Sequence, residues 1–204
     1  MASTRQRVLA GAAELAARDG FDTINMAELS SSSGVSNGSI YHHFGSKEGV
    51  LAALVAEIIL DYQDAVLAVL DTHAYDAHAG VLDTVTAHLR WTQEHRDQAK
   101  LLQTHSDQLA IGPRREQVRD LNRRFRERNE KWLWQQADAG ALPPVSVEVA
   151  HAVVFAPARE VCRVWLTHEA FPAPLSFSEA LGQAAWAGLR ALPVTATGRD
   201  GTTP

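Results

Sequence analysis

The chain has 204 residues, of which 46% are hydrophobic and 21% are charged, a composition typical of a globular protein with one or two domains. A net charge of −5 argues against a generic nucleic-acid coat protein, and the single cysteine, Cys162, cannot form an intramolecular disulfide. There is no apolar run long enough to cross a bilayer and no signal-peptide pattern, so we expect a cytoplasmic protein that does not engage the membrane.

The first predicted helix runs from about Thr4 to Arg18. Val8, Ala12 and Leu15 recur on one of its faces at helical spacing, and Gly20 would end it.

The stretch Asn25–Lys47 predicts two short helices around a tight turn. Asn25 is a favourable N-cap residue, and Glu28 stands three residues later, where its carboxylate can accept from the N–H of the cap. Gly34 can adopt a positive φ at no steric cost, which suits the end of the first short helix.

The second short helix is predicted at Asn37–Phe44. Ser36 would cap it, Ile40 and Phe44 would be buried, and Ser46 would cap the helix that follows. Two helices joined by a short glycine-containing turn form a helix-turn-helix. The outward side chains of the second helix are short or polar and suit base edges and phosphates: Asn37, Gly38, Ser39, Tyr41 and His42, with His43 beside them. The alternative is a helical hairpin inside an ordinary core.

The segment Thr4–Leu54 resembles the DNA-binding domain of the TetR family of bacterial transcriptional regulators. The matching residues are Ala12-Ala13, Gly20-Phe21, Gly34-Val35-Ser36, Ile40-Tyr41-His42-His43-Phe44 and Ser46-Lys47-Glu48. The serine run Ser30–Ser33 departs from the family, which more often has alanine at the first and last of these positions.

The resemblance implies a homodimeric, ligand-responsive regulator, best described as a repressor that a small molecule releases from its double-stranded DNA operator. Asn37, Gly38, Ser39 and His42 would contact bases. Tyr41, His43 and Lys47 would hold phosphates, with Asn25 on the same surface. The first fifty residues, however, carry four basic and five acidic side chains, which is unusual for a DNA-binding segment.

The remainder of the chain predicts further helices and no strand or internal repeat. We expect helices from Ser46 to near Asp71, at about 81–93, at about 97–109, from after Pro113 to about 139, from Ser146 with a kink at Pro157, and to about 192 from Ser178, which would cap it. The predicted fold is therefore all-α, with about nine helices. Its predicted parts are a DNA-binding domain (1–48), a ligand-binding and dimerisation domain (49–192) and a weakly ordered tail (193–204).

A ligand pocket is expected among the helices of the second domain. Aromatic walls with a few polar groups suit a small, largely apolar organic molecule. The candidate lining residues are His88, Trp91, His105, Phe125, Trp132 and Arg159. Arg159 stands among apolar residues, so it either leads to the surface or holds an acidic partner or a ligand carboxylate. Each aromatic residue could equally belong to a plain core.

The last two predicted helices are rich in small and apolar residues around most of their circumference. In the TetR family the corresponding helices form a four-helix dimer interface, and we favour that role over two buried core helices.

No enzymatic or metal site is predicted. The sequence contains no nucleophile–base pair, phosphate-binding glycine loop or tight metal-ligand cluster, so we expect neither catalysis nor a cofactor. His88 and His95, seven residues apart, are a weak metal candidate. A helical small-molecule-binding protein without DNA binding remains the alternative function.

Overall fold

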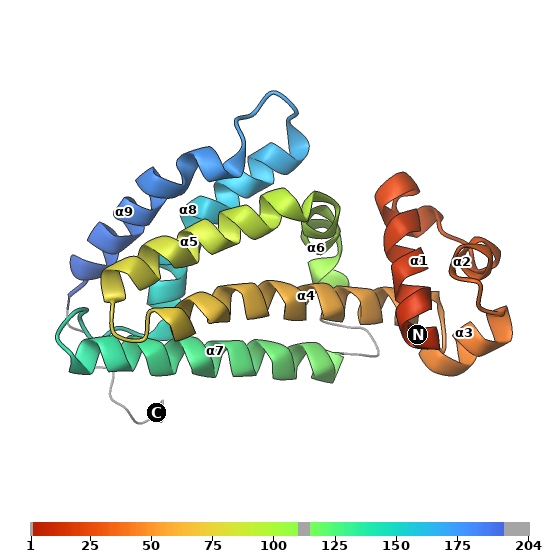
Figure 1. Cartoon of the computed structure of the whole chain (residues 1–204), viewed down its shortest axis with the longest axis horizontal. Coiled ribbons are helices and arrows are strands. Elements are labelled where there is room, and N and C mark those ends of the chain that lie inside the picture. Colours follow the sequence, from red (N-terminus) through yellow and green to blue (C-terminus); the bar gives the residue numbers. More distant parts are fainter. Residues whose placement is uncertain (1, 110–114, 194–204) are drawn as a thin grey trace. The chain divides into compact units, whose positions relative to one another are not determined.

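The computed structural model describes residues 2–109 and 115–193. Within these ranges the chain contains nine α-helices and no strand (Figure 1), which confirms the predicted all-α fold. The helices are α1 (Thr4–Asp19), α2 (Met26–Ser33), α3 (Asn37–Phe44), α4 (Lys47–Thr72), α5 (Ala77–Glu94), α6 (Arg96–Leu109), α7 (Arg115–Asp138), α8 (Val147–Thr167) and α9 (Ser178–Arg190), with short 3-10 turns η1 (Phe21–Thr23) and η2 (Pro174–Phe177). The predicted tail lies outside the described residues after Pro193.

The residues group into two compact units. The first comprises the described residues of 2–61 and 95–121, and the second those of 62–94 and 122–193. Helices α4 and α7 contribute to both units. The boundary predicted after residue 48 separates two functions, whereas the two units are defined by their internal contacts. The predicted boundary therefore stays a prediction.

In the first unit, α1 packs against α2, and α2 packs against α3. Gly11 lies where α1 crosses α2: a methyl group there would stand 3.1 Å from Ser32 Oγ and 3.2 Å from Ser33 N. The Ser33 hydroxyl donates to Leu29 O over 2.6 Å, and Ser30 Oγ donates to Val35 O over 2.7 Å. The serine run is accommodated because its side chains are small and these two hydroxyls are hydrogen-bonded.

The predicted caps of the helix-turn-helix are present. Asn25 Oδ1 accepts from Glu28 N at 2.9 Å, and Glu28 Oε2 accepts from Asn25 N at 3.4 Å, which completes a capping box. Gly34 has φ 62°, the left-handed conformation that ends α2, and Ser36 Oγ accepts from Ser39 N. Ser46 likewise accepts from Gly49 N at the start of α4.

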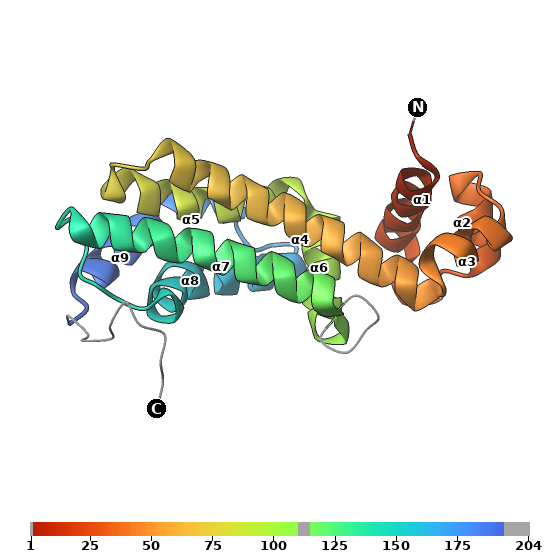
Figure 2. The same cartoon turned by 90° about the horizontal axis from the view of Figure 1, so that it is seen from below.

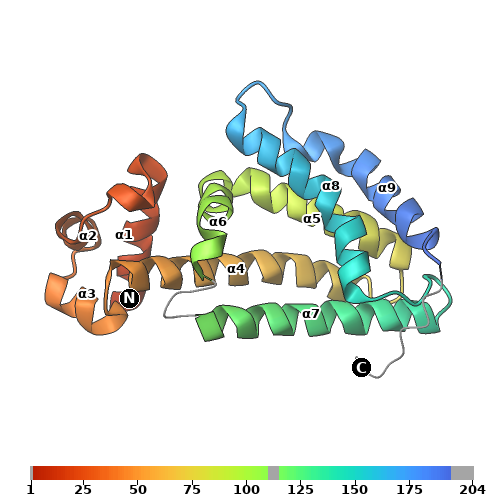
Figure 3. The same ribbon diagram turned by 180° about the vertical axis from the view of Figure 1, so that it is seen from behind.

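In the second unit, α5, α8 and α9 pack against one another, and Figure 3 shows α8 beside α9. Gly182 of α9 meets Leu82 of α5, and Gly188 meets Val153 of α8, where added methyl groups would stand 3.1 Å and 3.0 Å from the nearest side-chain atoms. Small residues therefore set the close approach of these helices. Within this unit the second half of α4 runs alongside α7 (Figure 2), and Gln63 Nε2 donates to Asn122 Oδ1 over 2.9 Å.

One predicted helix start and one predicted cap need correction. Helix α5 begins at Ala77 rather than near residue 81, because the Asp76 carboxylate accepts from Ala79 N at 3.0 Å and caps an earlier start. Ser178 does not cap α9: it is the first residue of that helix, and its hydroxyl donates to Leu175 O in the preceding turn η2. Pro157 lies inside α8, as predicted, and α8 bends along its course in Figure 3.

Candidate DNA-binding surface and ligand cavity

Helix α3 has one buried face and one exposed face. Ile40 is 0% exposed and Phe44 is buried as well, which fixes the rotation of the helix about its axis. The opposite face presents the candidate base- and phosphate-contacting residues. Asn37, Gly38, Tyr41, His42 and His43 are exposed, and Ser39 is half-buried.

Tyr41 presents its side chain to solvent rather than burying its ring. It is 49% exposed, whereas aromatic side chains usually bury most of their surface. His42 and His43 lie beside it with their rings edge-on at 5.6 Å between centroids. This face therefore offers a phenolic hydroxyl and two imidazoles to a partner.

Lys47 and Asn25 take part in local contacts at the edge of this surface. The Lys47 ammonium donates to Asp22 O over 2.7 Å and lies 5.5 Å from the centroid of the Phe21 ring. It therefore fastens η1 to the start of α4. Asn25 is occupied as the α2 cap.

Most cations of the first fifty residues have internal partners. Arg5 pairs with Glu57, and Arg18 Nε lies 2.6 Å from Asp19 Oδ2. Arg7 is exposed and forms no ion pair with the described residues. The charge available to an incoming anion is thus smaller than the count of basic residues suggests.

In the second unit, a cluster of aromatic and polar side chains joins α4, α5 and α8. Tyr62 Oη lies 2.9 Å from His88 Nδ1, and the Tyr62 ring meets Trp91 edge-on at 5.2 Å. His88 in turn meets Phe155 at 5.7 Å, and Phe155 meets His151 at 4.6 Å. We call these five residues the Tyr62 cluster.

The electrostatics of the cluster keep it neutral. Burial, together with the positive charge of Arg159 and His151, lowers the pKa of His88 to about 4. Burial also raises the pKa of the Tyr62 phenol above its ordinary value, although Arg159 opposes the rise. For His151, burial and Arg159 both lower the pKa.

A cavity of about 30 Å³, room for about two water molecules, shares Phe155 and His151 with this cluster. Its wall is mostly apolar. The lining residues are Leu70, Val81, Thr84, Asn129, Trp132, Leu133, Val147, Ala150, His151, Val154, Phe155 and Leu189. Trp132 is held in place because its Nε1–H donates to His73 O over 3.0 Å.

The structure brings three of the six candidate ligand residues to this region. His88 and Trp91 belong to the Tyr62 cluster, and Trp132 lines the cavity. Phe125 is half-buried against the neighbouring core, and Arg159 is exposed one turn beyond Phe155. His105 lies in α6, but its side chain is outside the described part of the chain.

Sequence reasoning missed four residues here: Tyr62, Thr84, His151 and Phe155. Tyr62 fits the apolar stripe of α4, so nothing marked it as a polar contact. His151, Phe155 and Arg159 recur every four residues along α8, which is the one signal that could have found them.

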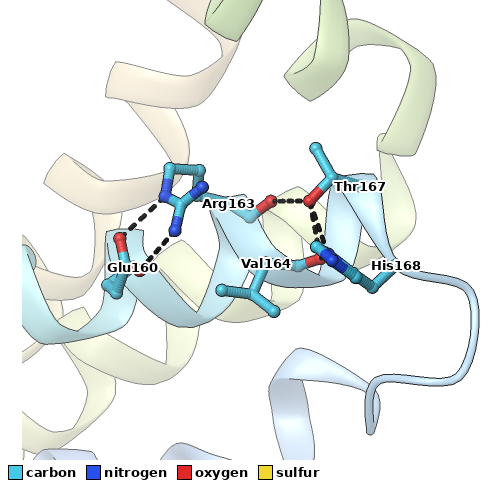
Figure 4. A network of polar contacts seen from close by, with 5 residues as sticks. All are labelled: Glu160, Arg163, Val164, Thr167 and His168. Carbon is cyan, nitrogen blue, oxygen red and sulfur yellow. Dashed lines mark hydrogen bonds and ion pairs between the residues drawn. The ribbon is translucent and has the colours of Figure 1, made fainter.

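The outer surface of α8 and α9 is partly apolar. Small or apolar residues are exposed there: Val149, Ala152, Ala156, Ala184 and Ala187. Near the end of α8 this surface becomes polar (Figure 4). Arg163 makes two hydrogen bonds with Glu160, at 2.6 Å and 2.8 Å, and Thr167 donates to Arg163 O. The Arg163 guanidinium holds the pKa of Glu160 below its ordinary value.

Helix α7 carries many basic residues, and three of its arginines have acidic partners. Arg126 pairs with Glu148 of α8, Arg128 with Asp71 of α4, and Arg123 lies 3.7 Å from Glu127. Glu127 therefore pairs with Arg123 in the preceding turn.

Among the described residues, no three His, Cys, Asp or Glu side chains come close enough to share a metal ion. No helix in the described ranges is long and apolar enough to span a membrane.

Comparison with known proteins relates these features to a family. The model of the "Bacterial regulatory proteins, tetR family" matches residues 8–54, which include the helix-turn-helix. The HTH-type transcriptional regulator UidR of Escherichia coli (strain K12) is 42% identical over 65 residues, 32% of this chain. The HTH-type transcriptional repressor AcnR of Corynebacterium glutamicum is 38% identical over 55 residues, 27% of this chain. These matches span 31% and 29% of the length of the two regulators.

The likeness in fold extends over most of the chain. The transcriptional regulator FadR from Bacillus subtilis, solved in complex with stearoyl-CoA, superimposes with a TM-score of 0.71 at 15% identity. The alignment covers 89% of this chain and 97% of FadR. At this identity the likeness establishes the fold alone. Residues 8–54 therefore form a DNA-binding domain of the TetR family of bacterial regulatory proteins, and the described helices share the fold of solved regulators of that family.

Proposed function

We propose that the chain is a ligand-responsive, DNA-binding transcriptional repressor and not an enzyme. The observation that carries the proposal is helix α3, which buries Ile40 and Phe44 and exposes an uninterrupted polar face. An exposed helix of this kind fits the major groove, where hydrogen-bonding side chains distinguish base pairs. The tetR-family model matches residues 8–54, which include α3, and the similar proteins UidR and AcnR are transcriptional regulators.

Roles on this surface follow from side-chain chemistry. Asn37, Gly38, Ser39 and His42 would contact base edges, because they are short or carry both donor and acceptor groups. Tyr41 and His43 would donate to phosphates. The Lys47 ammonium gives one of its three protons to Asp22 O, so it can still hold a phosphate, with Asn25 at the rim.

A homodimer is proposed through α8 and α9. Helix-turn-helix proteins commonly use two copies to grip half-sites about 34–36 Å apart. Val149 and Ala156 of α8, with Ala184 and Ala187 of α9, are exposed in the single chain and small enough for close helix packing. The variant Ala156→Glu should be monomeric in sedimentation velocity. The control Ala17→Glu changes an exposed residue of α1 and should remain dimeric. If Ala156→Glu were dimeric like the control, the proposed interface would be refuted.

Helix α4 is proposed to transmit the effect of ligand binding to the DNA-binding helix α3. This helix begins at Lys47, directly after α3, and carries Tyr62 of the aromatic cluster. An effector that moves Tyr62 would tilt α4 and change the separation of the two recognition helices. FadR, of the same fold, was solved with stearoyl-CoA, so the fold accommodates an organic ligand.

The test is fluorescence anisotropy of the purified protein on DNA from upstream of its own gene, at two salt concentrations and with excess random DNA. Specific, saturable binding is expected. Tyr41→Phe removes only a hydroxyl and should weaken binding by about tenfold or more, since a hydrogen bond to a charged group contributes roughly 1.5–3 kcal/mol. Tyr75→Phe is the matched control, because Tyr75 is exposed and belongs to the second unit. Equal binding by both variants would refute the phosphate contact.

A small-molecule-binding protein without DNA binding is the second candidate. It is favoured by the near-neutral first fifty residues and by the internal partners of Arg5, Arg18 and Lys47. Binding that random DNA removes completely would support this candidate over the repressor.

A further inference from the structure

Two polar atoms on one face of α5 are buried without a hydrogen-bond partner among the described residues. They are Thr84 Oγ1 and His88 Nε2, on residues only 4% and 7% exposed and one helical turn apart. Thr84 lines the cavity, and His88 contacts Phe155, which also lines it. Buried polar groups are normally paired, so this wall is suited to receive polar atoms from a ligand.

The tautomer of His88 can be assigned from its contact with Tyr62. The Tyr62 hydroxyl has one proton, and His88 Nδ1 is its hydrogen-bond partner at 2.9 Å. Tyr62 Oη has no other hydrogen-bond partner among the described residues, so it donates its proton to Nδ1, and the neutral imidazole carries its own proton on Nε2. The unpaired group at His88 is therefore an N–H donor, which calls for an acceptor.

Arg159 supplies positive charge at the same place. It lies one turn after Phe155 on α8, and its charge acts on Tyr62, His88 and His151. Arg159 forms no ion pair with the described residues, and the cavity lining contains no Asp or Glu within those residues. The N–H donor of His88 and the guanidinium of Arg159 face no carboxylate of the cavity lining, so they favour a ligand with an anionic acceptor group.

We propose that the effector is an organic acid with an apolar body, whose carboxylate accepts hydrogen bonds from Arg159, His88 Nε2 and Thr84 Oγ1 and whose body occupies the cavity beside Trp132. This assignment rests on the proposed function, since it names the ligand of the same regulatory site. Phe155 and Trp132 provide apolar contact surface for the body.

The cavity must widen to admit such a ligand. Its volume of about 30 Å³ is far below the roughly 300 Å³ or more of ligand pockets. Side chains such as half-buried His151 must move aside, so the described state is the closed one. Binding should then change the environment of Trp132 and Trp91.

The experiment uses the full chain without DNA and a panel of phenylacetate, 4-phenylbutyrate and 6-phenylhexanoate, each paired with its primary amide. Tm and tryptophan fluorescence are measured. At least one acid should raise Tm and bind at least tenfold more tightly than its amide. Arg159→Gln should abolish the preference and Arg159→Lys should retain part of it. Arg124→Gln, an exposed arginine of α7, is the matched control and should keep it.

Equal binding of acids and amides, or an unchanged preference in Arg159→Gln, would overturn the assignment. So would the absence of stabilisation by every acid, because internal water would then satisfy His88 and Thr84. Arg159 is exposed, so its variants should fold, and circular dichroism checks this. These outcomes are distinct from failure of the proposed repressor, which would show as loss of operator binding in the absence of any acid.

Discussion

Burial of His88 should make the stability of the protein depend on pH in a defined window. The imidazole has a pKa of about 4 in the fold, against 6.5 ordinarily. Above pH 6.5 both folded and unfolded chains hold it neutral, and its contribution to stability is complete. As the pH falls from 6.5 to about 4, His88 becomes protonated in the unfolded chain but stays neutral in the folded chain. Unfolding therefore becomes progressively more favourable.

The size of the effect follows from the two pKa values. The difference between 6.5 and about 4 corresponds to about 3 kcal/mol of unfolding free energy lost by pH 4. This is a large part of the roughly 5–15 kcal/mol that stabilises a typical domain. His88→Gln removes the titrating group while keeping a polar side chain, so it should flatten the pH dependence even if it lowers stability at pH 7.

The assay is urea unfolding followed by tryptophan fluorescence at pH 7.5, 6.5, 5.5 and 4.5. Other titrating groups, His151 included, are common to both chains and cancel in the difference between them. His168→Gln, an exposed histidine at the end of α8, is the control and should follow the unmodified protein. Parallel pH curves for the unmodified protein and His88→Gln would refute the burial argument.

Three further substitutions test a close helix approach, a helix cap and a side-chain hydrogen bond, each by urea unfolding. Gly49→Ala should cost about 2 kcal/mol, because its methyl group would collide with the backbone oxygen of Phe44; a more stable variant would contradict the close approach of α3 and α4. Asn25→Ala should cost about 1 kcal/mol through loss of the α2 cap, and no loss would deny the cap its role. Trp132→Phe should cost about 1 kcal/mol through loss of the hydrogen bond to His73 O, and a neutral effect would show that bond to be dispensable.

The helix-turn-helix could be predicted from sequence because its determinants are local. Asn25, Gly34 and Ser36 act on backbone groups within three or four residues, so residue type and spacing are enough to locate the caps. Two wrong predictions, the start of α5 and the capping role of Ser178, show the limit of the same signals. Asp76 and Ser178 are both favourable caps by type, but only Asp76 accepts the capping hydrogen bond.

The ligand site was predictable only in part because its contacts are non-local. Tyr62 and His88 are 26 residues apart, and His151 reaches the same cluster from α8 through Phe155. Whether a polar atom is left unpaired, as at Thr84, depends on every neighbour in the fold and leaves no trace in residue spacing. The aromatic residues were predictable as a class, but their arrangement was not.

The internal partners of the amino-terminal cations affect how strongly the DNA affinity of the protein would depend on ionic strength. Each phosphate neutralised by a cation contributes about −0.9 to the slope of log affinity against log salt concentration for duplex DNA. With Arg5 and Arg18 paired internally, Arg7 and Lys47 are the amino-terminal cations best placed to release counterions. A shallow slope is therefore expected, and such an operator complex would persist through osmotic stress that dissociates more strongly basic regulators.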